Sequence, residues 1–308
     1  MGYQDREYQK RMSLAQSRHS LITLIAANLV LFVILAFVNA TYALRYHESG
    51  EAARLFQQNV VSIFSLPAQF SKLATHPWTL ITHMFVHVDV WHIIGNMLWL
   101  WTFGYILQDL TGNRKIIPVY LYGGLAGGIA FILAYNFLPA LQPQLPYATA
   151  LGASAGVMAI AAAVTTIAPT YRLFPMLFGG IPVWVVTILY LVIDLVSIPK
   201  GNPGGHIAHL AGALTGFFFV FFFRRGYDWS AWLNQFFDWV SNLFNPDKPK
   251  RVKAMKQELF YKSKTKPFKK TPNITEQRVD EILDKINQKG YSALTEEEKE
   301  LLKRAAKE

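Results

Sequence analysis

Ser154 is the side chain in this sequence best placed to act as a nucleophile. It lies among the small residues of Leu151–Gly156, at the start of an apolar run that continues to Val164. A hydroxyl in such a run either bonds to its own helix or faces a protein cavity, because lipid offers it no partner. Gly152 would let the backbone approach a substrate carbonyl here. Small residues alone are equally typical of close helix packing, so a catalytic serine requires a base elsewhere.

His209 is the candidate base. Positions 205, 209, 212 and 216 share one helix face, and Gly212 and Gly216 on it allow a neighbouring helix to approach closely. A serine and a histidine at one depth suggest a nucleophile and its general base. His206 lies one turn earlier and is expected nearer the surface, so His209 is predicted to be the base.

Further polar residues lie between His83 and Asn96. His83 and His87 are four residues apart, as are His92 and Asn96, so each pair is expected on one helix face. The second pair could donate hydrogen bonds to a developing oxyanion, together with the free amide of Ser154 at a helix N-terminus. His83 and His87 are expected instead to shape the outer loop through hydrogen bonds.

These residues need a membrane-embedded scaffold. The chain has 308 residues, of which 52% are hydrophobic and 16% charged, and only Arg172 and Asp194 are charged between Lys115 and Lys200. Soluble domains carry about a quarter charged residues. Asp194 is interpreted as a structural hydrogen-bond partner. Runs of about 20 apolar residues can span a bilayer, and the fold class predicted is an all-α bundle of six transmembrane helices near residues 20–43, 84–107, 116–135, 154–168, 182–198 and 207–223.

The distribution of Lys and Arg predicts the orientation of this bundle, because basic residues collect in cytoplasmic loops. A cytoplasmic N-terminus places the basic residues of 1–19, Arg114, Lys115, Arg172, Arg224 and Arg225 inside. Both termini are then cytosolic in a multi-pass protein of the cell (inner) membrane. The candidate site opens to the outer side.

Five segments are expected. They are a cytosolic segment (1–19), the six-helix membrane domain (20–225), an amphipathic interfacial helix (226–247), a basic linker (248–270) and a cytosolic helical hairpin (271–308). The net charge is +10, and the tail from Arg224 holds 19 Lys/Arg against 13 Asp/Glu. This indicates attraction to the anionic lipid bilayer rather than to nucleic acid. Two short helices are marginal alone, so 271–308 is expected to bind a protein partner or to self-associate.

Three motifs resemble those of rhomboid intramembrane serine proteases. They are the small residues around Ser154, the sequence Ala208-His209-Leu210-Ala211-Gly212 with Gly216 after it, and the set His83, His87, His92 and Asn96 preceded by Trp78. The resemblance covers residues 20–225. It implies a Ser154–His209 dyad without an acidic third member, and an oxyanion hole of His92, Asn96 and the Ser154 amide. It also implies independence from metals and cofactors, transmembrane proteins as substrates, and a lateral gate at the fifth span.

Three positions depart from the usual rhomboid pattern. Thr79 follows Trp78 where many rhomboids have arginine. Ala155 stands where glycine is frequent. Met158 replaces an aromatic ring that packs on the catalytic histidine in some members.

Two other functions fit parts of the sequence. One is a metal-dependent membrane hydrolase with His83, His87, Asp89 and His206 or His209 as ligands, although no HExxH motif is present. The other is a non-catalytic membrane chaperone or adaptor, which would not need Ser154 together with His209. The absence of cysteine excludes thiol catalysis.

Overall fold

The chain divides into two compact units, Met1–Phe244 and Asn245–Glu308. The computed structural model describes residues 20–46, 48–174, 179–243 and 276–306. The segments expected at 1–19 and 248–270 lie outside these residues, as do residues 244–247 of the interfacial helix expected at 226–247.

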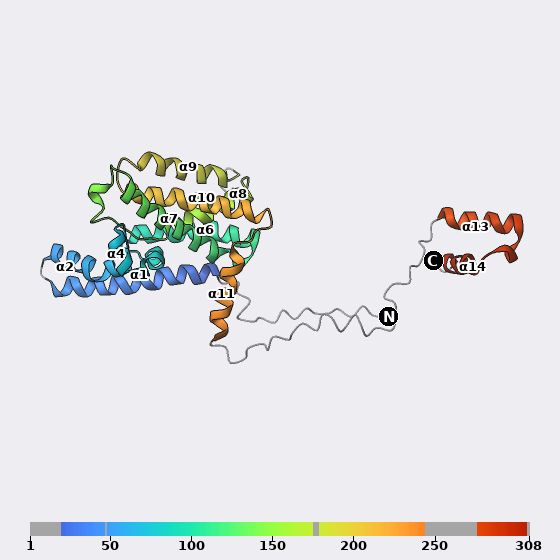
Figure 1. Ribbon diagram of the computed structural model, residues 1–308, viewed down its shortest axis with the longest axis horizontal. Helices are drawn as coiled ribbons and strands as arrows, with labels where there is room; N and C mark the ends of the chain where they lie inside the picture. Colours follow the sequence, from blue (N-terminus) through green and yellow to red (C-terminus); the bar gives the residue numbers. More distant parts are fainter. Residues whose placement is uncertain (1–19, 47, 175–178, 244–275, 307–308) are drawn as a thin grey trace. The chain divides into compact units, whose positions relative to one another are not determined.

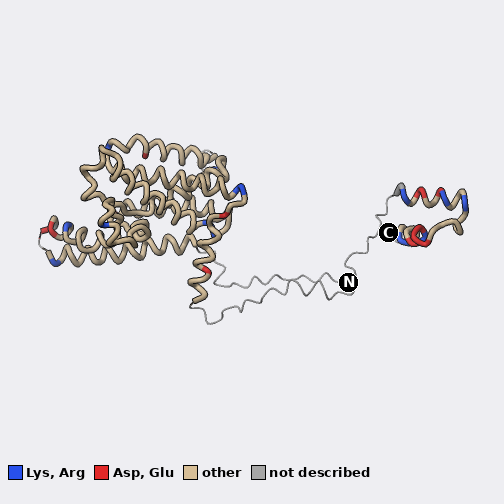
Figure 2. Tube along the Cα trace, viewed as in Figure 1, with Lys and Arg blue, Asp and Glu red and all other residues tan. Residues whose placement is uncertain are grey.

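The first unit is a membrane helix bundle (Figure 1). Every predicted apolar run forms a helix. Four long helical segments are apolar enough to cross a membrane, whereas two other apolar helices are shorter. Lys, Arg, Asp and Glu lie mainly at the two ends of the bundle (Figure 2). The main helices are α1 (Ser20–Arg45), α6 (Val90–Thr111), α7 (Ile116–Phe137), α8 (Ser154–Ile167), α9 (Val183–Ser197) and α10 (Pro203–Phe223).

Short elements connect these helices. The strands β1 (Leu66–Pro67) and β2 (Thr149–Ala150) pair antiparallel, with Leu66 opposite Ala150. This pairing ties the loop before α6 to the segment that enters α8. The other elements are α2 (Ser49–Phe56), the π-helical η1 (Gln57–Val61), α3 (Ser62–Phe64), α4 (Phe70–Thr75), α5 (Thr79–Thr82), the 3₁₀ turns η2 (His83–Phe85), η3 (Asn113–Lys115) and η4 (Gln142–Gln144), and the paired strands β3 (Arg172–Leu173) and β4 (Ile181–Pro182).

Helix α8 is the centre of the bundle. All its side chains from Ala155 to Val164 are buried, and α10 packs against α7, α8 and α9. A Cβ added to Gly212 would lie 2.2 Å from the carbonyl oxygen of Ala155, and one added to Gly216 would lie 1.9 Å from that of Ala159. The glycine-lined face of α10 therefore sets the close approach of α8 and α10, as the spacing predicted.

Two helix starts differ from the prediction. Helix α6 begins at Val90 rather than 84, because the side chain of Asp89 accepts a hydrogen bond from the amide of His92 (2.7 Å) and caps the helix. The prediction that His83 and His87 share a helix face is therefore wrong: both precede α6. Helix α10 begins at Pro203 rather than 207, after Asn202 as its cap.

Helix α11 (Ser230–Leu243) runs across the direction of α1 and α10 (Figure 1). Its start is held at the α6–α7 turn by Lys115, which donates hydrogen bonds to Asp228 and to Ser230. Burial alone would raise the pKa of Asp228, but these bonds outweigh it and lower the pKa below its usual value. The exposed Trp232 and Trp239 give α11 the composition of an interfacial helix.

The second unit is a helical hairpin of α13 (Glu276–Lys289) and α14 (Glu296–Ala305), joined through the 3₁₀ turn η5 (Tyr291–Ala293). Ile282, Leu294 and Leu301 are buried between the helices. Lys285 pairs with Glu298 at 2.8 Å. The hairpin also contains the capping box expected at Thr295.

Candidate active site

Ser154 is the first residue of α8 and follows a tight turn at Gly152. Gly152 has a φ of +115°, which L side chains rarely adopt, and its amide donates a hydrogen bond to the carbonyl of His83 (2.8 Å). A Cβ added at Gly152 would lie 2.7 Å from Cε1 of His92. Glycine is therefore required here for two reasons, its backbone conformation and the room it leaves for the His92 ring.

The structure brings Ser154 and His209 together. Nε2 of His209 lies 2.7 Å from Oγ of Ser154, across the α8–α10 contact that Gly212 makes possible. His209 is the seventh residue of α10, because this helix begins at Pro203 rather than near 207. The distance and partners are those of a nucleophile and its general base.

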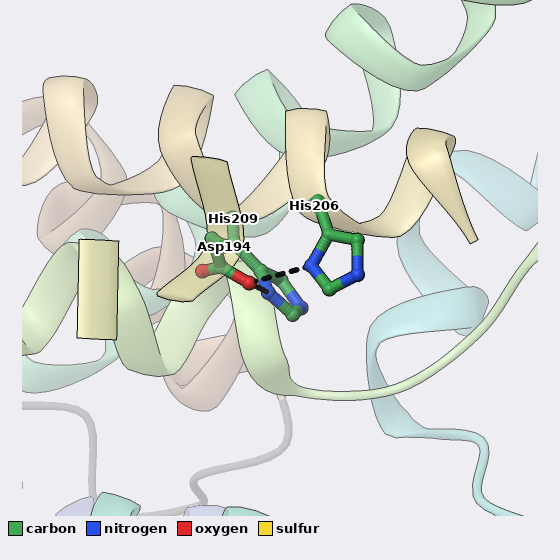
Figure 3. A group of neighbouring side chains, drawn as sticks. All are labelled: Asp194, His206 and His209. Atoms are coloured by element: carbon green, nitrogen blue, oxygen red, sulfur yellow. Dashed lines mark hydrogen bonds and ion pairs between the residues drawn. The ribbon is translucent and has the colours of Figure 1, made fainter. Parts of the chain in front are cut away.

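Asp194 contacts both histidines of α10 (Figure 3). Its Oδ1 lies 3.0 Å from Nδ1 of His209 and 2.7 Å from Nδ1 of His206. The resemblance implied no acidic third member, but here a carboxylate lies at the second ring nitrogen of His209. Asp194 is indeed a hydrogen-bond partner, as predicted, and its partners include the candidate base itself.

Tyr190 supplies an aromatic ring beside His209. The two rings are stacked, with centroids 6.3 Å apart and an interplanar angle of 26°. Met158 is buried next to Tyr190, in the small cluster that it forms with Ala162 and Ala213. The ring absent at Met158 thus has a counterpart on α9. The residues around Ser154 in the sequence give no sign of Tyr190, because it lies on a different helix. The one sequence signal was that Tyr190 and Asp194 lie four residues apart and therefore on one face of that helix.

Asn96 and His87 form a hydrogen-bond network beside Ser154. Nδ2 of Asn96 lies 3.1 Å from Nε2 of His87 and 3.1 Å from the carbonyl oxygen of His92. The amide of Ala153 donates to the same Nε2 of His87 (3.3 Å). His87, fully buried, therefore holds both Asn96 and the turn before the serine. Sequence reasoning gave it a loop role and missed this link.

His83 and the residues before it stabilise the outer loop. Nδ1 of His83 lies 2.8 Å from the carbonyl oxygen of Thr79, and Nε1 of Trp78 donates to the carbonyl of Ile63 (2.8 Å). Thr79 is fully buried, and its hydroxyl donates to the carbonyl of His76 (2.6 Å). Thr79, a departure from the rhomboid pattern, is thus an integral part of this loop.

Two cavities meet at Ser154. One of about 220 Å³ is mainly apolar and lies among α6, α8, α9 and α10, with Trp99, Phe103 and Val157 in its wall. The second, of about 290 Å³, is more polar and extends towards Thr149 and Asn202. Ser154, His92 and His209 line both, and Asn96 lines the first. Ser154, His209, His92 and Asn96 therefore line one shared space.

The candidate metal ligands are distributed differently from the hydrolase hypothesis. Within the described residues, one group of three ligand atoms lies close together, from Asp194, His206 and His209. His83, His87 and Asp89 are not part of it. Nδ1 of His83 is engaged by a backbone carbonyl, Nε2 of His87 by Asn96, and Asp89 by its helix cap. The ligand set proposed from the sequence is therefore wrong.

Comparison with known proteins finds family matches for two parts of the chain. Residues 74–226 match the Rhomboid domain family, and residues 268–308 match a family of unknown function, DUF6576. RHOMBOID-like protein 12, mitochondrial, of Arabidopsis thaliana is 31% identical over 144 residues, which are 44% of this chain and 43% of the relative. The presenilin-associated rhomboid-like protein, mitochondrial, of Homo sapiens is 31% identical over 171 residues, which are 53% of this chain and 42% of the relative.

The chain thus spans less than half the length of these relatives. The matched region contains α6–α10 and every residue that lines the contact of Ser154 with His209. With its helical membrane bundle and its matching domain, this chain belongs to the rhomboid family.

Proposed function

We propose that this chain is an intramembrane serine endopeptidase that cleaves transmembrane segments of other membrane proteins. The observation that carries the proposal is the 2.7 Å contact between Oγ of Ser154 and Nε2 of His209 at the junction of two cavities. A hydroxyl paired with an imidazole inside an apolar bundle matches the requirements of nucleophilic catalysis better than those of helix packing. The same pairing speaks against a purely non-catalytic chaperone or adaptor.

The reaction follows from these positions. Oγ of Ser154 attacks the scissile carbonyl carbon while Nε2 of His209 takes the hydroxyl proton. The imidazolium returns this proton to the departing amine, which leaves an ester on Ser154. Water, deprotonated by His209, attacks the ester, and the proton then returns to Ser154 as the new carboxyl terminus departs.

The oxyanion of each tetrahedral intermediate would be bound by donors already present around the cavity. The amide of Ser154 is at the helix N-terminus, where amides have no acceptor within the helix. His92 and Asn96 line the cavity beside it. The Asn96 amide donates to His87 and to the His92 carbonyl, which positions it beside the cavity, and it would exchange one of these two bonds for a bond to the oxyanion.

The membrane topology is a further part of the proposal. The start of α1 and the α6–α7 turn border one cavity with α11, whereas Ser154 and the cap of α10 border another. An even number of crossings places both ends of the bundle domain on one side, and the basic loops favour the cytosol for it. The site then opens to the opposite side of a cell membrane.

The test is cleavage by the full-length protein reconstituted in vesicles, with a transmembrane substrate carrying small residues near the cut. We expect cleavage that continues in EDTA, because no step uses a metal. Loss of cleavage with EDTA and its return with Zn²⁺ would instead support a metal-dependent hydrolase. A correctly folded protein that binds several transmembrane substrates without cutting any would support the adaptor function.

Replacement of the oxyanion donors gives a separate expected result. One lost donor lowers kcat by about 10²–10³-fold where others do not compensate. We expect Asn96→Ala to reduce kcat with little change in KM, and His92→Ala to act in the same direction. His87→Ala should reproduce part of the Asn96 effect, since His87 holds that amide. Steady-state kinetics in vesicles measure both constants, and a change in KM alone would remove Asn96 and His92 from this role.

A further inference from the structure

We infer that Asp194 is a positioning residue for His209, so that the proposed site works as a Ser154–His209–Asp194 triad. This inference rests on the proposed function. The carboxylate comes from α9 and the imidazole from α10, and their contact is 3.0 Å long. Asp194 is only 4% exposed, and it is the sole formal charge of α9. A carboxylate within an apolar span is costly and therefore needs a specific partner.

The contact selects the tautomer of His209. A neutral imidazole carries one N–H, and a carboxylate can accept a hydrogen bond but cannot donate one. The proton must then be on Nδ1, where it is donated to Oδ1 of Asp194. This leaves Nε2 with a free lone pair directed at the Ser154 hydroxyl, 2.7 Å away. The opposite tautomer would place a hydrogen between Nε2 and the serine and abolish general-base action.

The same contact stabilises the charged intermediate. When His209 has taken the serine proton, it is an imidazolium beside a carboxylate that water reaches poorly. Attraction between opposite charges is stronger in such surroundings than in water. Asp194 therefore favours the state that must form as the serine attacks, without itself accepting the proton.

His206 completes the surroundings of the carboxylate. Its Nδ1 donates to the same Oδ1 that accepts from His209, so both histidine donors converge on one oxygen (Figure 3). The other oxygen, Oδ2, is buried and has no hydrogen-bond partner among the described residues. His206 thus fixes the carboxylate in the orientation that His209 requires. It has no contact with Ser154 among the hydrogen bonds of the described chain.

Asp194 also links α9 to α10, so a role in positioning His209 must be distinguished from a role in holding the two helices together. Thr187 provides the matched control: it is a buried polar residue on α9, and its hydroxyl bonds Thr165 of α8 at 2.7 Å. Thr187→Val removes an interhelical hydrogen bond of the same helix. Thr187 also lines the apolar cavity but makes no hydrogen bond to His209 among the described residues, so its effect on KM is measured separately from its effect on kcat. If Asp194 only joins helices, Asp194→Asn and Thr187→Val should affect stability and activity in parallel.

The kinetic test uses the full-length protein in vesicles. Asp194→Asn keeps the side-chain shape and removes the charge. We expect kcat to fall by up to about 10⁴-fold, the loss seen when a triad aspartate is replaced by asparagine, with KM nearly unchanged. Thr187→Val should lower kcat far less at a similar loss of Tm. An Asp194→Asn enzyme within about threefold of wild-type kcat, a difference of only about 0.6 kcal/mol, would overturn the inference, and so would equal losses in both variants.

A spectroscopic test does not depend on activity. ¹⁵N NMR of histidine-labelled protein, with His209 assigned by its absence in His209→Ala, reports which ring nitrogen carries the proton. We expect neutral His209 to be protonated on Nδ1 in the wild type and to lose this preference in Asp194→Asn or, should that variant fail to fold, in Asp194→Ala, since neither variant keeps a carboxylate. A wild-type His209 protonated on Nε2 would overturn the inference. An inactive wild type with Nδ1 protonated would refute the proposed protease function alone.

Discussion

Ser154→Ala is expected to eliminate cleavage of a transmembrane substrate while the protein remains folded. The hydroxyl is the only group within hydrogen-bond distance of Nε2 of His209 among the described residues, so its removal leaves nothing to form the acyl-enzyme. In serine proteases such a change costs about 10⁶-fold in kcat. His209→Ala should cost nearly as much, because two residues that act as a unit are not additive. The measurement is product formation in vesicles, by immunoblot or fluorescence.

The control for this prediction lies on the same helix. The hydroxyl of Thr166 bonds only the carbonyl of Ala162 in its own helix (2.7 Å). Thr166→Ala should therefore cleave the substrate at close to the wild-type rate. A Ser154→Ala protein that still cleaves would show that the nucleophile is elsewhere. A double variant of Ser154 and His209 that is far slower than either single variant would show that they do not act together.

Gly216→Ala is expected to produce the largest loss of stability among single-methyl changes in the bundle. The added Cβ would lie 1.9 Å from the carbonyl oxygen of Ala159, and this obstacle is backbone rather than a flexible side chain. Helices α8 and α10 must then separate. Overpacking of a well-packed core lowers the free energy of unfolding by about 1–3 kcal/mol. The Tm in detergent should fall clearly. Activity should fall too, because Ser154 and His209 belong to these two helices.

Gly95→Ala is the matched control for Gly216→Ala. It also adds one methyl group to a helix of the bundle, but no heavy atom beyond its chain neighbours and the nearby backbone of its own helix lies within 4 Å of the added Cβ. Alanine is favoured over glycine in helices by up to about 1 kcal/mol, so Tm should be unchanged or slightly higher. Equal Tm values for Gly216→Ala and the wild type would contradict the close contact of α8 and α10.

The helices could be predicted from the sequence because each span is a long apolar run. The first residue of each helix was harder to predict. In α6 the apolar character begins at Met84, but Asp89 caps the helix five residues later. In α10 the apolar run begins at Ile207, whereas Asn202 and Pro203 start the helix earlier. Hydropathy indicates which residues lie in the membrane, whereas capping residues determine where the helical backbone begins. The start of an apolar run and the start of a helix therefore need not coincide.

The candidate site was predicted only in part, for a related reason. Ser154 and His209 are marked by the small residues around them, which permit the helix contact that joins them. No small residues identify Asp194 and Tyr190 in the sequence. Their contacts with His209 join α9 to α10 and depend on how these two helices are rotated about their axes. Their four-residue spacing on an apolar helix was the available signal.

The most direct test of Ser154 as an activated nucleophile is covalent labelling by a fluorophosphonate, which reacts with an activated serine. The full-length protein in vesicles is treated with the reagent, with and without EDTA, and the modified residue is identified by mass spectrometry of its peptides. We expect one adduct, on Ser154, formed equally with EDTA and absent from the His209→Ala variant. An adduct on another residue, or no reaction by folded wild-type protein, would contradict it.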